Sequence, residues 1–519
     1  MGVEGSSAEA GVEARPWWES RLCLVLVVLA TMVPLLYPPI PPLVDLLGHM
    51  GRYKVELDLS HSSFLQQYYD YHWAAIGNLG VDLLVIPLGE LLGLEPAVKL
   101  IVLAIPPLTA IGFLWVAREV HGRVPPTAFF ALPFIYGYPF LFGFVNFALS
   151  VALAFLAFGL WLRLGRLDRT ALREWLFVPI SLIVFFCHTY GWGLLGLMCF
   201  SADAVRLHDR GRPWWRAGLE AALHTSVMAL PILVMLIWRS ETHGGGTIDW
   251  FDWKVKWRWI YSALRDQWKW FDIGSLIAAA LVFLYAILNR IFGRSLTLSR
   301  NLAFSAIVLA ISFVLIPRIV FGSAYADMRL VPYLAAVGLL AIRFRGVPHR
   351  PTAQVLAVLG LLFFATRTAA NTLSLGEAGS DQAALLHAID EMPRGARVIT
   401  LTGLPCTEYW PLLRNSHLGA MVIVRREGFS NDQWLLEGVN LLDLKYRAAG
   451  YFAADPSQLV RPNHCRDPLH RTIDDSLAAL PRNDFDYLWL IDAPPYDPTI
   501  MAGIQPVWRG PHSILYRLH

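Results

Sequence analysis

Apolar runs that are long enough, or nearly long enough, to cross a lipid bilayer recur along this chain, and they constrain its fold more than any other feature. A helix needs about 20 predominantly apolar residues to cross the hydrocarbon core of a bilayer. Of the 519 residues, 55% are hydrophobic and only 16% are charged, whereas about 25% of the residues of a soluble domain are charged. The sequence therefore predicts a polytopic α-helical membrane protein with runs at 22–37, 97–118, 127–143, 146–163, 175–188, 190–206, 217–238, 273–291, 301–317, 329–345 and 352–370.

These runs give eleven predicted crossings, several of which are shorter than a straight membrane helix. We expect 127–163 and 175–206 to form two tight hairpins. Residues 71–93 are also apolar, but they contain two acidic side chains and the helix-interrupting Pro87. We expect this segment to lie in the outer surface layer or to re-enter the membrane rather than to cross it.

Arginine-rich segments alternate with the apolar runs, and this alternation predicts the orientation of the chain, because positive loops stay in the cytoplasm. No cleavage site follows the first run, so we expect an uncleaved first helix behind a cytoplasmic tail. An odd number of crossings then places the end of the chain outside. The segments expected inside are "REVHGR", "RLGRLDRTALRE", "RLHDRGRPWWR", "NRIFGRSLTLSR" and "RFRGVPHR".

The predicted organisation is a cytoplasmic tail at 1–21, a transmembrane domain at 22–370 with large outer loops at 39–96 and 239–272, and an extracytoplasmic α/β domain at 371–519. The last of these has a size typical of a domain. Its patterns predict an amphipathic helix at 381–392 and strands at 396–401, 420–426, 485–492 and 513–519.

Two of the five cysteines, Cys406 and Cys465, fall in the predicted exported domain. An oxidising compartment permits a disulfide between them. The sequence leaves open whether they pair, because it does not give their separation.

Asp45, His49 and Arg52 follow four prolines at the end of the first run. Their spacing places all three side chains on one face of a helix. Asp45 lies among apolar residues, where a carboxylate is costly unless it is used, so we expect it to act as a general base that accepts the proton of an attacking hydroxyl. His49 and Arg52 would tune its pKa or hold an anionic group. A simple Asp45–Arg52 salt bridge is the alternative.

The short outer loop "IPRIVFGSAYADMRL" carries Arg318, Tyr325, Asp327 and Arg329. Its arginines contradict the positive-inside pattern, which suggests that they bind an anion such as a lipid phosphate. An internal Asp327–Arg329 pair is the structural alternative.

Polar residues at the turns of the two predicted hairpins would face the same side: Tyr138, Asn146 and His188. We expect them to contact substrate, although a lone histidine is more often a structural group. The tryptophans of 240–272 alternate with charged residues, a composition typical of a helix in the lipid headgroup layer.

Motifs for other chemistries are missing from the sequence, which has no Walker loop, no HExxH, no CxxC and no GxSxG. A net charge of +3 is too small to indicate a nucleic-acid partner. Any reaction would therefore use a substrate carried by the membrane.

In its order of parts, the chain resembles the bacterial branch of the GT-C glycosyltransferase superfamily. The matching pieces include "PPLVDLLGHMGRY", "VKLIVLAIPPLTAIGFLWVAREVHGR", "FGFVNFALSVALAF", "FFCHTYGWGL", "ADMRLVPYLAAVGLL" and "FDYLWLIDAPPYDP". The resemblance implies a membrane domain with a first outer loop carrying the acidic base, and transfer of a hexose or pentose from a polyprenyl-phosphate donor to a glycolipid, polysaccharide or protein acceptor.

On this resemblance Asp45 is the base, and Arg318 and Arg329 hold the donor phosphate. Many members carry a second acidic residue beside the first, whereas here Asp45 stands alone. One carboxylate and one histidine are a thin ligand set for Mg²⁺ or Mn²⁺, so we assign no metal ligands and leave dependence on a divalent cation open.

We therefore expect a multi-pass enzyme of the bacterial cytoplasmic (inner) membrane, with a cytoplasmic N-terminus and partners limited to the donor, the acceptor and membrane lipids. Two alternatives stay open at this point. The chain could be a flippase or exporter of a lipid-linked saccharide, although it shows no half-to-half repeat. It could also be a non-catalytic subunit of a cell-envelope glycan complex.

Overall fold

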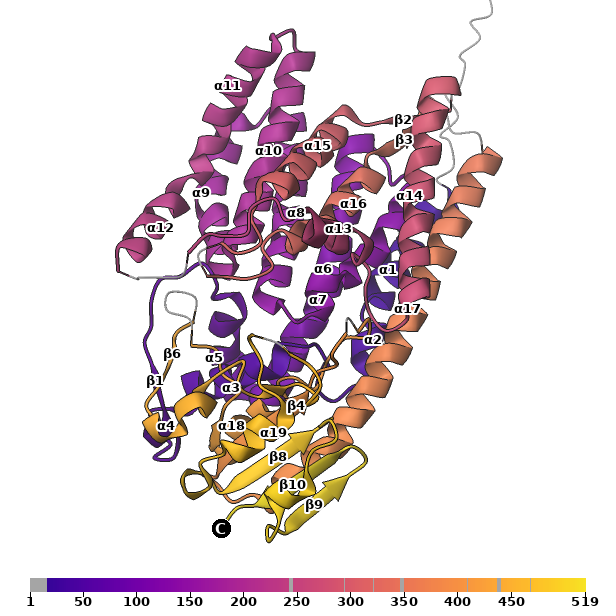
Figure 1. Cartoon of the computed structure of the whole chain (residues 1–519). Coiled ribbons are helices and arrows are strands. Elements are labelled where there is room, and N and C mark those ends of the chain that lie inside the picture. The colour runs from indigo at the N-terminus through magenta and orange to yellow at the C-terminus, as the bar shows by residue number, and fades with distance from the viewer. Residues whose placement is uncertain are drawn as a thin grey trace, which may run out of the picture.

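The structure is a computed structural model that describes residues 16–241, 246–293, 295–320, 322–345, 350–407, 409–435, 440–466 and 468–519, without the side chains of 238–241 and 350. A bundle of helices occupies one part of the molecule and a mixed sheet lies at one end of it (Figure 1). The bundle contains α1 (Arg21–Ala30), α2 (Val33–Leu36), α6 (Leu94–His121), α8 (Val145–Arg166), α9 (Thr170–Cys187), α10 (Thr189–Asp209), α11 (Trp214–Thr225), α12 (Leu230–Glu241), α14 (Lys269–Phe292), α15 (Arg300–Leu315), α16 (Val331–Leu340) and α17 (Arg350–Leu385).

Among the described residues, five helices are long and apolar enough to cross a membrane, or six if the pair Trp214–Met228 and Leu230–Ile237, bent by 59°, counts as one span. Of the other predicted runs, 190–206 lies on the 21-residue helix α10, which is not among these five, and the rest lie on shorter helical segments. The number of eleven crossings therefore stays a prediction. Helix α5 (Gly80–Leu92) has 13 residues. At about 1.5 Å per residue it extends only ~20 Å, too short for a straight crossing.

The predicted membrane helix at 127–143 is wrong in its conformation. Residues Pro126–Tyr136 form a 3₁₀ helix, η2, and only Tyr138–Leu141 (α7) is α-helical. All residues of η2 are buried. A 3₁₀ helix rises about 2.0 Å per residue, so it covers more distance with fewer residues. Such backbone is tolerated within a membrane protein where other helices shield it from lipid.

The arginine-rich segments gather at the end of the bundle opposite the sheet, as the positions of α11, β2 and β3 show (Figure 1). Two of the segments pair as antiparallel strands, β2 (Leu296–Leu298) and β3 (Ile342–Phe344). Ion pairs connect this end: Arg123–Glu19, Arg166–Glu119, Arg210–Asp168 and Arg300–Asp209. The charge pattern of the sequence thus corresponds to one physical end of the bundle.

The C-terminal region forms a six-stranded sheet with the order β5-β4-β8-β10-β9, in which β7 also pairs with β4. Strand β4 is parallel to β5, β7 and β8, whereas β10 is antiparallel to β8 and β9. Its bounds are β4 (Arg397–Gly403), β5 (Phe429–Ser430), β7 (Leu459–Val460), β8 (Tyr487–Ile491), β9 (Pro506–Gly510) and β10 (Ser513–Arg517).

The strand predicted at 420–426 is wrong, because Met421–Arg426 forms the short helix α18. A short apolar run does not distinguish a strand from a buried helix. The amphipathic helix predicted at 381–392 is the end of α17 followed by the 3₁₀ helix Leu386–Glu391.

The first outer loop folds against the C-terminal region. Helix α3 (Leu46–Asp58) packs on α18. Strand β1 (Tyr69–Tyr71) pairs antiparallel with β6 (Leu442–Leu444). One hydrophobic core contains Val55 and Tyr69 from the loop together with residues of β4, β5 and β8. The loop and the sheet therefore form one body.

Two buried ion pairs lie where the bundle meets the C-terminal region, one within the bundle and one between the two parts, and we call their four residues the interdomain clamp: Asp266, Asp272, Arg367 and Arg414. Arg367 on α17 binds Asp272 on α14 at 2.6 Å. Arg414, in the loop after β4, binds Asp266. Trp410 from the same loop donates to Asp272 at 2.8 Å. The C-terminal region is thus attached to the bundle by groups whose charges are paired.

The tryptophan-rich segment contains helix α13 (Trp253–Tyr261), and most of the segment's tryptophans are exposed, whereas Trp259 is buried. The exposed fractions of Trp257 and Trp270 are 64% and 79%. This exposure agrees with the prediction of an interfacial segment.

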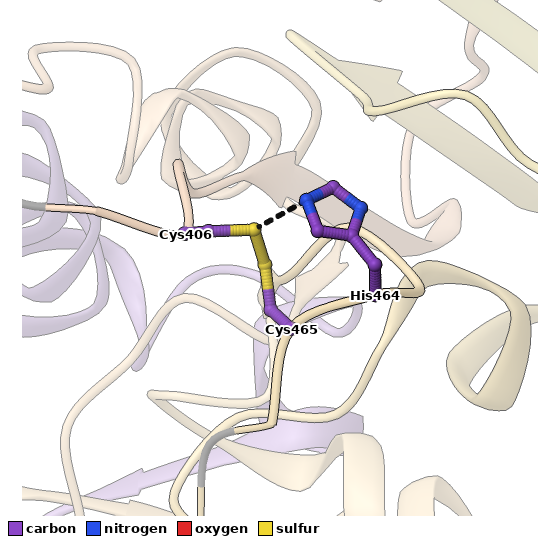
Figure 2. A group of neighbouring side chains, drawn as sticks. All are labelled: Cys406, His464 and Cys465. Carbon is purple, nitrogen blue, oxygen red and sulfur yellow. Dashed lines mark hydrogen bonds between the residues drawn. A yellow bond between two sulfur atoms is a disulfide. The ribbon is translucent and has the colours of Figure 1, made fainter.

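The structure joins Cys406 and Cys465 by a disulfide, a pairing that the sequence left open (Figure 2). Their Cα atoms are 5.6 Å apart, within the usual range for a disulfide. The bond connects the loops that follow β4 and β7.

Candidate active site

A cavity of about 420 Å³ lies where the first outer loop, the bundle and the C-terminal region meet. Of the ten residues that the sequence singled out, the structure brings seven to the wall of this cavity: Asp45, His49, Arg52, Asn146, His188, Tyr325 and Arg329. The other three, Tyr138, Arg318 and Asp327, are not among the lining residues.

Asp45 immediately precedes α3, where the chain turns after the four prolines. Its backbone N–H donates to the carbonyl of Phe142 at 2.9 Å. Gly143 adopts a φ of +99°, and a Cβ atom there would lie 2.7 Å from the backbone nitrogen of Asp45. Glycine is needed for this close approach. The turn at 142–143 therefore fixes the position of Asp45.

The carboxylate of Asp45 is nearly buried, with 13% of the side chain exposed, and its ion-pair partner in the described part of the chain is His417, whose Nε2 lies 3.9 Å from Oδ1. Burial raises the pKa of Asp45 well above its usual value, and the negative charge of Asp455 raises it further, whereas Arg329 lowers it. A carboxylate with a raised pKa is, in its ionised form, a stronger general base than an ordinary one.

Arg329 is 94% buried, and in the described part of the chain it makes no ion pair with a carboxylate. Its guanidinium lies 4.4 Å from the ring centroid of Phe144 and 5.2 Å from that of Tyr190. Its Nη2 donates to the Ala324 carbonyl at 3.3 Å, and its Nε has no partner. A buried cation of this kind requires compensation by an anion.

His188 lies beside Arg329, with Nε2 3.1 Å from Nη1 of the guanidinium. The Nδ1 of His188 lies 3.1 Å from the backbone nitrogen of Tyr190 at the start of α10. A guanidinium carries donors and no acceptor, so in the contact between the two side chains Nη1 of Arg329 donates to Nε2 of His188. His188 thereby orients the guanidinium of Arg329 at the cavity.

Arg52 and Asn146 line the cavity, but their polar groups serve mainly to build its wall. Arg52 pairs with Asp82 at 2.7 Å, so the alternative of an Asp45–Arg52 salt bridge is wrong. Asn146 donates to Asp82 at 2.9 Å and accepts from the N–H of Val81 at the start of α5. This buried pair holds α3, α5 and α8 together beside Asp45.

The three predicted residues outside the cavity have structural partners. Tyr138 accepts a hydrogen bond from Arg265. Asp327 pairs with the buried Lys256 at 3.2 Å, so the alternative of an internal Asp327–Arg329 pair is also wrong. Arg318 lies behind Tyr325, with its guanidinium 5.7 Å from that ring. Of the two predicted phosphate-binding arginines, the structure therefore places only Arg329 at the cavity.

Tyr325 has a φ of +61°. A bulky residue rarely adopts this left-handed conformation, which is often found where function constrains the backbone. Its ring packs against Phe142 and Phe144, with centroids 5.5 and 6.4 Å apart. The strained residue thus carries an aromatic ring into the wall of the cavity.

The C-terminal region contributes residues that the sequence did not single out, above all Trp434 and Asp455. Both lie in loops of the sheet region, in "NDQWLLEG" and "FAADPSQ", which contain no motif. Trp434 packs on His49 and His417, with ring centroids 5.0 and 4.5 Å away. Burial and neighbouring positive charges lower the pKa of His49 well below its usual value, so this imidazole is neutral at pH 7.

Metal binding finds little support in the cavity. Among the residues that the structure describes, one group of three ligand-type side chains has its ligand atoms within 4.8 Å of one another: Cys406, His464 and Cys465. The two sulfur atoms of this group are bonded to each other (Figure 2), so they do not offer two thiolates. Whether the reaction depends on a divalent cation stays open.

Comparisons with known proteins found neither a matching family model nor a matching curated protein. They did find solved structures of ArnT from Cupriavidus metallidurans. The one bound to undecaprenyl phosphate has a TM-score of 0.50 and 12% sequence identity, and the match covers 96% of this chain and 98% of that chain. The apo structure gives a TM-score of 0.49 and 13% identity, covering 96% and 97%. The chain therefore has the overall fold of the ArnT structure bound to undecaprenyl phosphate.

Proposed function

We propose that this protein is a membrane glycosyltransferase that transfers a sugar from a polyprenyl-phosphate donor to a hydroxyl of a glycolipid, polysaccharide or protein acceptor. One observation carries the proposal. A nearly buried carboxylate, Asp45, and a buried guanidinium, Arg329, line the same cavity, and among the described residues Arg329 has no carboxylate partner. The fold supports it, because an ArnT structure with this fold is bound to undecaprenyl phosphate.

The donor's phosphate would occupy the space that Arg329 and His188 face. The negative charge on this phosphate grows as the bond between the anomeric carbon and the phosphate oxygen breaks. Donors fixed in a buried site stabilise such developing charge without reorganising. Arg329 supplies a full positive charge, and His188, which accepts a hydrogen bond from Nη1 of Arg329, holds the guanidinium in place.

Asp45 would accept the proton of the acceptor hydroxyl as its oxygen attacks the anomeric carbon. The new glycosidic bond forms, the phosphate leaves on its polyprenyl chain, and the protonated Asp45 then releases its proton to water. No general acid is needed to protonate the leaving group, because the phosphate departs as a stable anion.

The orientation that fits this reaction places the cavity and the sheet on the extracytoplasmic side of the bacterial inner membrane. The arginine-rich end of the bundle lies opposite the sheet and would face the cytoplasm (Figure 1). This orientation is part of the proposal.

The test is to incubate the purified full-length protein, in nanodiscs, with a polyprenyl-phosphate sugar labelled in the sugar and with a membrane extract as the source of acceptor. We expect the label to leave the lipid and to appear on a second product. Asp45→Asn should abolish this transfer, with Glu220→Gln at the opposite end as the control. Label that crosses the membrane with its linkage to the lipid intact would instead identify a transporter.

A further inference from the structure

The cavity has two unlike halves, which come from different parts of the chain. The half beside α8 and α10 contains Arg329 and His188, and its charge is positive. The other half is formed by loops of the C-terminal region that contribute Trp434, Asn440 and Asp455. Asp45 lines the same cavity and lies near both Arg329 and Asp455, since both affect its ionisation.

The approach of Trp434 to α3 depends on a glycine. A Cβ atom at Gly48 would lie 2.5 Å from Cη2 of Trp434. With glycine there, the indole packs on the first turn of α3, between His49 and His417. The ring is thus held in one orientation while part of it lines the cavity.

Asp455 is held by its own loop. Its backbone N–H donates to the carbonyl of Gln433 at 3.0 Å, and its Oδ1 accepts from Gln458 at 2.6 Å. Its nearest ionisable partner in the described part of the chain is His417, at 4.0 Å. Burial lowers the pKa of His417, so this imidazole is neutral at pH 7 and leaves the charge of Asp455 uncompensated.

Asn440 supports the wall rather than facing a ligand. Its amide nitrogen donates to the carbonyl of Trp434 at 2.6 Å, and its oxygen accepts from Arg52 at 3.4 Å. The half of the cavity formed by the C-terminal region thus presents an aromatic ring and a carboxylate.

We propose that Trp434 and Asp455 form the sugar-binding half of this cavity and that it selects a donor sugar without a carboxylate, rejecting uronic acids. The inference rests on the proposed function and extends it to the class of sugar. An indole packs on the C–H face of a sugar ring, while a carboxylate accepts hydrogen bonds from its hydroxyls. A uronic acid would bring a further negative charge beside Asp455 and Asp45, where like charges repel.

The test compares three ligands by their affinity for the full-length protein in nanodiscs. These are undecaprenyl phosphate and the same lipid carrying glucose or glucuronic acid, which differ only at C6. We expect the wild type to bind the glucosyl lipid at least tenfold more tightly than the glucuronyl lipid. Asp455→Asn should reduce this ratio at least fivefold while changing the affinity for undecaprenyl phosphate less than twofold.

Arg329→Gln is the matched control, because it should weaken binding of all three lipids and leave the ratio unchanged. In Trp434→Ala the sugar should no longer add to the binding affinity, so that the glucosyl lipid binds only as tightly as undecaprenyl phosphate. Trp434→Phe should retain most of the affinity that the sugar adds. Thermal unfolding of each variant checks that it is folded.

Two outcomes separate this inference from the proposed function. If the wild type binds undecaprenyl phosphate but its preference between the sugars is absent or survives in Asp455→Asn, the sugar-binding half is disproved and the donor proposal stands. If the wild type binds none of the three lipids, the proposed function itself fails, and the inference fails with it.

Discussion

The interdomain clamp and the cavity both contain buried aspartates and arginines, but they use them in opposite ways. In the clamp, Arg367 and Asp272 lie 2.6 Å apart, and each is about 1% exposed. In the cavity, Asp45 has a neutral imidazole as its nearest ionisable partner, and Arg329 faces aromatic rings. These residue types are paired with one another within the clamp, whereas at the cavity Asp45 and Arg329 have no such partner in the described part of the chain.

This difference distinguishes groups that support the fold from groups that are available to a ligand. Burying a charge without a partner costs free energy. A protein keeps such a residue where the residue serves its function. The clamp does not carry this free-energy cost to the same extent, since each of its charged side chains is paired with one of opposite charge. Substitutions at the cavity should therefore change the rate of transfer and ligand binding, whereas substitutions in the clamp should change stability.

The largest expected effect is on catalysis. Asp45→Asn should lower the rate of transfer by about 10²–10⁴-fold, the usual contribution of a general base. Thermal stability should be unchanged or slightly higher, because an uncompensated buried charge is removed. Asp272→Asn is the matched substitution in the clamp and should lower the melting temperature. Equal rates for the wild type and Asp45→Asn would remove Asp45 from the mechanism.

The next effect concerns stability. Arg367→Met leaves Asp272 buried without its partner, a loss of about 3–5 kcal/mol in the free energy of unfolding. Arg329→Met breaks no ion pair and should cost much less, while it weakens binding of undecaprenyl phosphate. Thermal unfolding and lipid binding of the two variants, measured in the same detergent, check both. A larger loss of stability in Arg329→Met than in Arg367→Met would contradict the distinction between the regions.

A smaller effect is expected when the charge at the cavity is kept but its shape is changed. Arg329→Lys retains a cation but loses the planar fork of donors, and the two groups are not equivalent in binding phosphate. We expect about tenfold weaker donor binding, or roughly 1.4 kcal/mol. The measurement is the KM for the donor. An unchanged KM would indicate that Arg329 does not contact the phosphate.

The smallest effect is a shift in pH dependence. Asp45 acts as a base only when it is ionised, so the rate should fall as the pH drops through its raised pKa. Asp455 raises that pKa and Arg329 lowers it. Asp455→Asn should therefore move the acidic limb of the profile to lower pH, and Arg329→Gln should move it to higher pH. Profiles of kcat/KM test the two signs, and shifts in the same direction would refute this electrostatic description.

Much of the bundle could be predicted from the sequence, because hydrophobic length and arginine placement are local properties of the chain. The spacing of Asp45, His49 and Arg52 likewise brought three residues to one wall, since helical periodicity is local as well. The 3₁₀ helix Pro126–Tyr136 was missed because its apolar run has the same composition as a membrane α-helix.

The partners of each charged residue could not be predicted in the same way. Arg52 binds Asp82 and Asp327 binds Lys256, and nothing in the sequence distinguishes these pairs from the nearer ones that it suggested. Asp455 reaches the cavity from a loop more than 400 positions beyond Asp45, through a fold that local patterns do not specify. Arg318 and Arg329 have similar surroundings in the sequence, but only the second faces the cavity.

Helix α17 runs without a break through residue 370, the point at which the sequence pattern divides the chain. Its 36 residues extend about 54 Å, from the arginine-rich end of the bundle to the sheet (Figure 1). A continuous helix of this kind would transmit a tilt of its bundle part directly to the sheet. Thinning or thickening of the bilayer, which tilts membrane helices, would rotate the sheet together with Trp434 and Asp455. Lipid composition would then control turnover.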